Sequence, residues 1–254
     1  MKLEGQRVIL TGAASGIGQA LLELLAQYPL EIIAADRDEA RLLEVCGALE
    51  NSRAKVVPVV ADVSSQTGND ALFEQALLEF GGVDIFIANA GFAYFETIQQ
   101  PDWGRLELIY NVNTLAPIYA LERMTALSGA KPFKVVWMAS AMAHIGLPKY
   151  AAYSSSKGAL HRFADAYRWQ MPDPRALMLV YPIATRTRFF AALSIATPVP
   201  TPSQTPEEVA RAVLRGIAAD RLEVYPSPLF QVGFWLTLWF PALRRFVQIR
   251  ELRN

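Results

Sequence analysis

A tyrosine and a lysine four residues apart, Tyr153 and Lys157, point most directly to chemistry in this chain. On a helix this spacing places both side chains on one face. A free tyrosine has a pKa of about 10 and is a poor base at neutral pH, but a neighbouring ammonium favours the phenolate and lowers that pKa. The pair therefore predicts proton transfer to or from an alcohol, although the same spacing also occurs by chance on surface helices.

Three glycines, Gly12, Gly16 and Gly18, follow the first apolar run. Ser15 directly precedes Gly16, and Ile17 lies between Gly16 and Gly18. Glycines at a turn from a strand into a helix let the backbone approach a pyrophosphate, and the helix amino terminus offers free N–H groups and a positive dipole end. Ordinary turn chemistry would also place glycines here. The position of the motif, after the first strand and before the first helix, favours dinucleotide binding.

An acidic residue, Asp36, ends the second apolar run, 18 residues after Gly18. A carboxylate at about this distance binds the ribose hydroxyls of a dinucleotide in Rossmann-type proteins. It would also repel a 2′-phosphate, which favours NAD as the cofactor. The adjacent Arg37 could pair with that phosphate, so NADP stays the alternative.

The chain positions these residues by alternating short apolar runs with helical patterns. The strands are predicted at Val8–Leu10, Ile32–Ala35, Val56–Val60, Ile85–Ala88, Lys134–Met138, Ala176–Tyr181 and Leu222–Tyr225. The helices are predicted over Gly18–Tyr28, Asp38–Leu49, Asn69–Phe80, within Trp103–Leu127, and over Tyr153–Gln170 and Pro206–Ala219. This pattern indicates an α/β protein with one Rossmann-like, doubly wound parallel sheet, helices on both faces, and ligands at the carboxyl ends of the strands.

Composition excludes several classes of protein. The 254 residues carry 24 basic and 24 acidic side chains, so net charge gives no reason to expect nucleic-acid binding. The single cysteine, Cys46, allows no internal disulfide, and two histidines, His144 and His161, provide no zinc-type cluster, so no metal is expected. The first residues lack the layout of a signal peptide, which favours a cytoplasmic location.

Two further polar residues are placed to join Tyr153 and Lys157 at one site. Ser140 ends the fifth predicted strand, 13 residues before Tyr153, and Asn113 lies in the long fourth helical segment. With Tyr153, Lys157 and the glycine turn, they resemble the short-chain dehydrogenase/reductase family over nearly the whole chain. The resemblance implies that Tyr153 is the general acid/base and that Lys157 lowers its pKa and holds the nicotinamide ribose. It also implies that Ser140 orients the substrate oxygen and that Asn113 holds a proton-relay water.

The resemblance extends to the cofactor side. Asp62 and Val63 resemble the pair that borders the adenine, and Asn89-Ala90-Gly91 resembles the turn that stabilises the sheet beside the cofactor. Thr187 stands where the family's threonine contacts the carboxamide. The family also implies a homodimer or a homotetramer.

Two positions depart from the family pattern. Ala116 replaces a usual glycine, which is a mild change. Pro182 is followed by Ile183 where the family usually has glycine, and a β-branched residue does not easily adopt positive φ. The turn that places residues 184–187 is therefore expected to differ.

Three mostly apolar segments are expected to border the substrate: Phe92–Phe95, Met142–Ile145 and Arg188–Phe190. They favour a lipophilic ketone or secondary alcohol, although aromatic residues that simply cover the core would give the same pattern. His144 is expected to be a wall residue. The proline-rich stretch Thr197–Pro206 is expected to be a surface loop near the site.

The C-terminal segment is unusually apolar. We divide the chain into a catalytic dinucleotide-binding domain at 1–228 and an extension at 229–254, which is either part of that domain or a membrane or dimer contact. Its apolar run is shorter than the roughly 20 residues that span a bilayer. Tryptophans followed by arginines suit peripheral contact with a membrane, and a helix that covers the substrate mouth or a partner subunit is the competing interpretation.

Three functions fit these residues. The first is NAD(P)-dependent hydride transfer between a nicotinamide and a carbonyl or alcohol. The second is dehydration or epimerisation with a bound nicotinamide, which the same residues would also support. The third is a cofactor-binding sensor without turnover, which would have no need of the four residues Asn113, Ser140, Tyr153 and Lys157.

Overall fold

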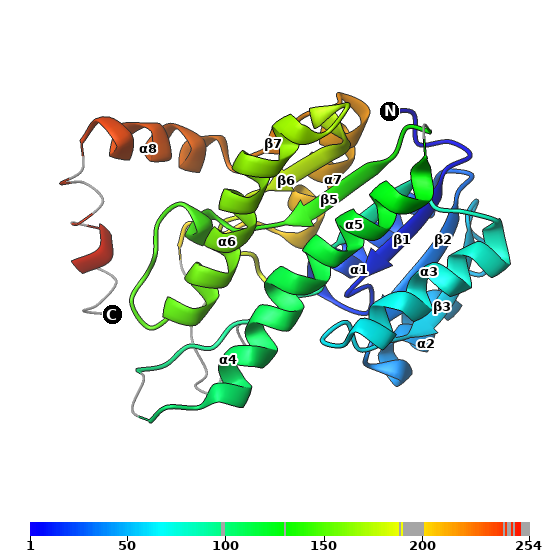
Figure 1. The fold of residues 1–254 in the computed structure, drawn as a ribbon, viewed down its shortest axis with the longest axis horizontal. Coiled ribbons are helices and arrows are strands. Elements are labelled where there is room, and N and C mark those ends of the chain that lie inside the picture. The colour runs from blue at the N-terminus through cyan, green and yellow to red at the C-terminus, as the bar shows by residue number, and fades with distance from the viewer. Residues whose placement is uncertain are drawn as a thin grey trace.

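A computed structural model describes residues 1–97, 100–129, 131–187, 189, 201–240, 242, 245 and 247–249. Strands and helices alternate along the chain and build one central sheet with helices on both sides (Figure 1). The predicted Rossmann-like α/β fold in a single domain is confirmed.

The sheet has seven parallel strands in the order β3-β2-β1-β4-β5-β6-β7. The strands are β1 (Arg7–Thr11), β2 (Glu31–Asp36), β3 (Lys55–Val60), β4 (Ile85–Ala88), β5 (Lys134–Met138), β6 (Leu177–Val180) and β7 (Glu223–Val224). The order reverses between β1 and β4. In such sheets the crevice outside the carboxyl ends of the strands at this point receives the ligand.

Each face of the sheet has its own helical layer and its own hydrophobic core. One core joins the sheet to α1 (Gly16–Leu25), α2 (Glu39–Gly47) and α7 (Pro206–Ala218). The other joins it to α3 (Gln66–Phe80), α5 (Ala116–Ser128) and α6 (Ala151–Tyr167). The strand side chains point alternately into the two cores, which is why the strands are apolar throughout.

Several predicted boundaries were wrong by a few residues. The long segment within Trp103–Leu127 is two helices, α4 (Trp103–Tyr110) and α5, joined by a π-helical turn at Asn111–Leu115. The helix predicted over Tyr153–Gln170 starts earlier, at Ala151, and its last residues form a 3₁₀ turn. The seventh strand is shorter than Leu222–Tyr225.

The predicted loop Thr197–Pro206 lies partly outside the described residues. Its described part runs from residue 201 to Thr205, whose side chain caps α7. Gln204 pairs with Thr185, so this stretch is tied back to the segment that follows β6.

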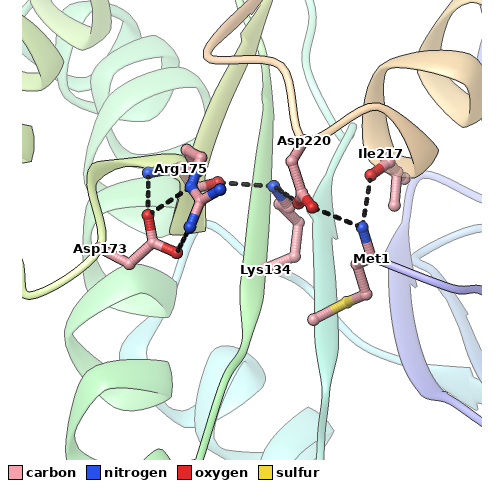
Figure 2. A network of polar contacts seen from close by, with 6 residues as sticks. All are labelled: Met1, Lys134, Asp173, Arg175, Ile217 and Asp220. Carbon is pink, nitrogen blue, oxygen red and sulfur yellow. Dashed lines mark hydrogen bonds and ion pairs between the residues drawn. The ribbon is translucent and has the colours of Figure 1, made fainter.

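The amino ends of the strands are closed by ion pairs (Figure 2). Lys134 is buried at the start of β5 and donates to the carbonyl oxygen of Arg175 at 2.6 Å and to Asp220 Oδ1 at 2.8 Å. The second oxygen of Asp220 accepts from the Met1 ammonium at 2.8 Å. These contacts join the first residues, β5 and the end of α7 at the edge opposite the ligand crevice.

Helix α8 (Pro228–Trp239) follows β7 and lies to one side of the sheet (Figure 1). In the described part of the chain no helix is both long and apolar enough to cross a membrane.

Candidate active site

The glycine turn between β1 and α1 adopts backbone conformations that need glycine. Gly12 and Gly16 have φ values of +68° and +56°. A Cβ on Gly12 would lie 2.9 Å from the Cα of Ala90, so the turn also packs tightly against the end of β4. A Cβ on Gly18 would collide with the Gly12 carbonyl oxygen. Gly18 therefore closes the turn and does not line the crevice.

The amino terminus of α1 is left open for a ligand. Its N-cap residue, Ser15, makes no side-chain capping bond, and no acidic residue occupies the first turn. By contrast, Ser65 and Thr205 cap α3 and α7 with their hydroxyls. An uncapped helix amino terminus beside a glycine turn is a site for an anion such as a pyrophosphate.

Asp36 and Arg37 lie at the end of β2 on the wall of the crevice. The Asp36 carboxylate accepts from the backbone N–H of Ala14 at 3.0 Å and from that of Asp38 at 3.1 Å. The carboxylate is thus held in place by backbone donors, while Arg37 is exposed.

Two predicted residues, Asp62 and Asn89, order the turns that follow β3 and β4. Asp62 Oδ1 accepts from the Ser64 N–H at 2.9 Å, which orders the turn after β3. Asn89 donates from Nδ2 to the carbonyl oxygens of Thr11 at 3.0 Å and Gly12 at 3.1 Å. The Asn89 amide therefore ties the end of β4 to the glycine turn, as a sheet-stabilising residue would.

Tyr153 lies at the start of α6, and burial raises the pKa of its phenol to about 12. A side-chain hydrogen bond with Ser140 acts in the opposite direction but is outweighed. Ser140 follows β5, and its Oγ also accepts from the Met142 N–H at 3.1 Å. The two hydroxyls are thus held together at the carboxyl end of the sheet.

Lys157 lies one turn further along α6 and is 3% exposed. Its Nζ donates to the carbonyl oxygen of Met138 at 2.8 Å and lies 6.0 Å from the centre of the Tyr153 ring. Burial lowers the pKa of Lys157 to about 7. The predicted lowering of the Tyr153 pKa by this ammonium is therefore wrong for the structure, because desolvation of the phenol prevails.

Asn113 lies in the π-helical turn and is fully buried. Its Oδ1 accepts from the Phe92 N–H at 3.1 Å, and its Nδ2 donates to the Phe92 carbonyl at 2.9 Å and to Ser156 Oγ at 3.1 Å. Gly91 makes room for it, since a Cβ there would lie 3.1 Å from Asn113 Oδ1 and 3.3 Å from Lys157 Nζ. The side chain joins the turn after β4 to α6.

The turn after β6 accommodates Ile183 without positive φ, since Lys149 and Asp220 are the non-glycine residues with positive φ in the described chain. Thr187 lies against the glycine turn: a Cβ on Gly16 would be 3.0 Å from its Cγ2. Thr187 is thus placed beside the α1 amino terminus despite the departure from the family pattern.

One cavity of about 580 Å³ collects these residues. All the predicted site residues except Gly18 and Asn113 line this cavity. The lining residues among them are Gly12, Ser15, Gly16, Ile17, Asp36, Arg37, Asp62, Val63, Asn89, Gly91, Ser140, Tyr153, Lys157 and Thr187. Gly18 and Asn113 lie behind the residues that line the cavity. The glycine turn and Tyr153 therefore border the same continuous cavity.

A family model described as short chain dehydrogenase matches residues 6–196, more than half of the chain. The chain belongs to the short-chain dehydrogenase/reductase family. It is accordingly an NAD(P)-dependent dehydrogenase or reductase.

Some of the curated relatives are named as reductases. A ketoacyl reductase, HetN, from Nostoc is 27% identical over 226 residues, covering 87% of this chain and 78% of the relative. The 3-dehydrosphinganine reductase of Danio rerio is 28% identical over 198 residues, covering 75% of this chain and 60% of the relative.

Solved structures share the fold. A short-chain dehydrogenase/reductase from Burkholderia phymatum in complex with NAD has a TM-score of 0.83 at 22% identity, over 96% of each chain. A short-chain dehydrogenase from Sphingobium yanoikuyae in complex with NADPH has a TM-score of 0.79 at 23% identity, over 95% of this chain and 94% of that one.

The segments expected to border the substrate contribute mostly apolar side chains to the cavity. Of the segments expected there, Phe92, Ala93, Tyr94, Met142 and Phe189 line the cavity. His144 does not line it and instead stacks on Phe234 of α8, while Arg188 and Phe190 lie outside the described residues.

Sequence reasoning missed several lining residues, which are Ala35, Ala61, Val112, Met138, Ala139, Ile183, Ala184 and Thr185. Most are small or apolar residues at or just beyond strand ends. Their only signal in the sequence is that they adjoin the predicted polar residues.

Proposed function

We propose that this enzyme reduces lipophilic ketones, with Tyr153 donating the proton to the substrate oxygen. The observation that supports this is the Tyr153–Ser140 pair at the apolar end of the cavity, beside Phe92, Tyr94 and Phe189. A phenol with a pKa of about 12 keeps its proton at neutral pH, so it can act as the acid toward a carbonyl oxygen that gains negative charge. Ser140 orients that oxygen by a hydrogen bond.

The residues present fit a nicotinamide dinucleotide. The uncapped α1 amino terminus and the glycine turn would hold the pyrophosphate, Asp36 the adenosine ribose, and Asp62 with Val63 the adenine. Lys157 would hold the nicotinamide ribose, and Thr187 the carboxamide. The bound cofactor would supply or accept the hydride, while the chain supplies position and the proton.

We propose NAD as the preferred cofactor. The Asp36 carboxylate is fixed by two backbone N–H groups and would receive the ribose hydroxyls, whereas a 2′-phosphate there would meet its negative charge. NADH and NADPH are titrated separately, with tryptophan fluorescence as the signal. We expect NADH to bind more tightly than NADPH. The D36N variant is the matched test, and it should bind the two cofactors about equally. Tighter binding of NADPH by the unaltered enzyme would mean that Arg37 decides.

The catalytic assignment is tested with Y153F. We expect a loss of turnover of about 10²–10⁴-fold, because the proton donor is removed. NADH affinity should stay nearly unchanged. Activity close to that of the unaltered enzyme would contradict the assignment of Tyr153.

The substrate class is tested with ketones of increasing apolar size, following oxidation of NADH. Burial of each added methylene contributes about 0.8 kcal/mol, so kcat/KM should rise with apolar size until the cavity is filled. Turnover of small polar ketones alone would contradict a lipophilic substrate. The homodimer or homotetramer and the cytoplasmic location stay predictions.

A further inference from the structure

Helix α8 has an apolar surface that the described protein does not cover. Its twelve residues, Pro228–Trp239, include no charged side chain. Large apolar side chains on it are exposed: Leu229 by 73%, Val232 by 60%, Trp235 by 54%, Leu236 by 46% and Trp239 by 79%. Contiguous apolar surface of this kind marks an interaction site more often than ordinary protein surface.

The opposite side of α8 is anchored to the enzyme. Phe234 stacks on His144 with ring centres 4.1 Å apart, and Phe230 stacks on Tyr225 at 6.4 Å. Ser227 caps the helix by accepting from the Phe230 N–H at 3.2 Å. The helix is thus held by an inner aromatic side, which fixes the direction that its outer side faces. In Figure 1 α8 lies at the margin of the molecule, away from the sheet.

The charges that follow α8 favour a lipid partner over a second copy of the chain. Residues 226–254 contain four arginines, Arg244, Arg245, Arg250 and Arg253, and one acidic residue, Glu251. A segment with a net positive charge complements anionic headgroups, whereas two copies that met through this segment would bring like charges together. Tryptophan side chains such as Trp235 and Trp239 also favour the boundary between headgroups and acyl chains.

The length of α8 decides how it can meet a bilayer. Twelve residues extend roughly 18 Å, which is less than the hydrocarbon core of about 30 Å. The helix can therefore lie in the plane of the interface but cannot span it.

We propose that the outer side of α8 binds the surface of an anionic lipid bilayer, with Trp235 and Trp239 in the headgroup region and the inner side still packed on His144 and Tyr225. The enzyme is then a peripheral membrane protein that α8 orients on the lipid surface.

The test uses the full chain and vesicles of phosphatidylcholine with an equal part of phosphatidylglycerol, without substrate or cofactor. Co-sedimentation with these vesicles is expected, with weaker binding to phosphatidylcholine alone and at high salt. W239A should bind about tenfold more weakly, because one large exposed side chain no longer enters the lipid. W169A is the matched control, since Trp169 is 72% exposed on another part of the molecule, and it should bind normally.

Two results would overturn the proposal. Equal binding of W239A and W169A would show that α8 does not face the lipid. No binding of the unaltered enzyme, together with a lower oligomeric mass for W239A in sedimentation, would identify a second copy as the partner. Neither vesicle binding nor oligomeric mass depends on turnover. A negative result for lipid binding therefore leaves the proposed ketone reduction untouched, and the reverse also holds.

Discussion

Strand β5 has a buried lysine at each of its ends, and the two differ in their partners. Lys134 is its first residue and is 1% exposed, while Lys157 of α6 donates to Met138, its last residue, and is 3% exposed. Each ammonium donates to a backbone carbonyl oxygen, at 2.6 Å for Lys134 and 2.8 Å for Lys157. Burial and this hydrogen bond are therefore common to both.

The difference is a carboxylate. Lys134 also contacts Asp220 Oδ1 at 2.8 Å, whereas the ion pairs of the described residues include none with Lys157. Without a counter-charge, desolvation lowers the pKa of Lys157 to about 7. At the amino edge of the sheet the buried charge is neutralised and serves the fold. At the carboxyl edge it is left unneutralised, which costs stability and leaves the ammonium available to a ligand.

The largest effect is expected for K157M. Turnover should fall by about 10²–10⁴-fold, because the group proposed to hold the nicotinamide ribose is lost. The free energy of unfolding should stay unchanged or rise by up to about 4 kcal/mol, since a buried charge without a carboxylate partner is removed. Steady-state kinetics and urea unfolding measure the two quantities. A clear loss of stability would contradict the contrast between the two lysines.

For D220N we expect a loss of stability without a loss of turnover, the reverse of K157M. Asparagine tolerates the positive φ of 50° at this position, so the change isolates the charge. The unfolding free energy should fall by about 1–2 kcal/mol, because buried Lys134 loses its carboxylate partner, while Asp220 itself is half-exposed and screened by solvent. The double variant K134M/D220N should recover part of this loss. kcat should not change in either protein, and an altered kcat would show that the amino edge communicates with the site.

The pH dependence of stability should separate the two edges. The folded pKa of Lys157, about 7, lies below its usual 10.5, so the unfolded chain binds the proton more tightly and stability rises as pH increases from about 7 to 10.5. The pKa of Asp220 is lowered to about 2 by Lys134 and the Met1 ammonium, so its contribution is complete above its usual 3.8 and is lost toward pH 2. The unfolding midpoint of K157M should no longer rise with pH between about 7 and 10.5. That of D220N should fall less as the pH is lowered toward 2. Retention of both slopes would refute the assignment.

The smallest effect is expected for G91A. The new Cβ would lie 3.3 Å from Lys157 Nζ and 3.1 Å from Asn113 Oδ1, so both groups must shift by a few tenths of an ångström. Turnover should fall by about threefold, since small misplacements weaken a preorganised site. The control is G47A on α2, where a Cβ meets nothing within 4 Å, and its turnover should be unchanged. Equal kinetics in both variants would show that the position of Lys157 is not limiting.

The sequence predicted the parallel sheet because its strands are apolar on both faces and are separated by helical patterns. It also predicted which residues gather, since the carboxyl ends of parallel strands meet at one edge and most polar residues singled out follow such ends. The break at Asn111–Leu115 was not predictable, because a π-helical turn changes no periodicity that a short window can detect.

The sequence by itself determined the family, the sheet and the identity of the polar groups at the site, because spacing along strands and helices is a local property. The tertiary structure decided what each group does there. It turned Asn113 and Gly18 away from the cavity, and it raised the pKa of Tyr153 through burial that no local spacing records. It also gave Lys134 a carboxylate 86 residues distant and gave Lys157 none, because counter-charges come from whichever segments the fold brings together.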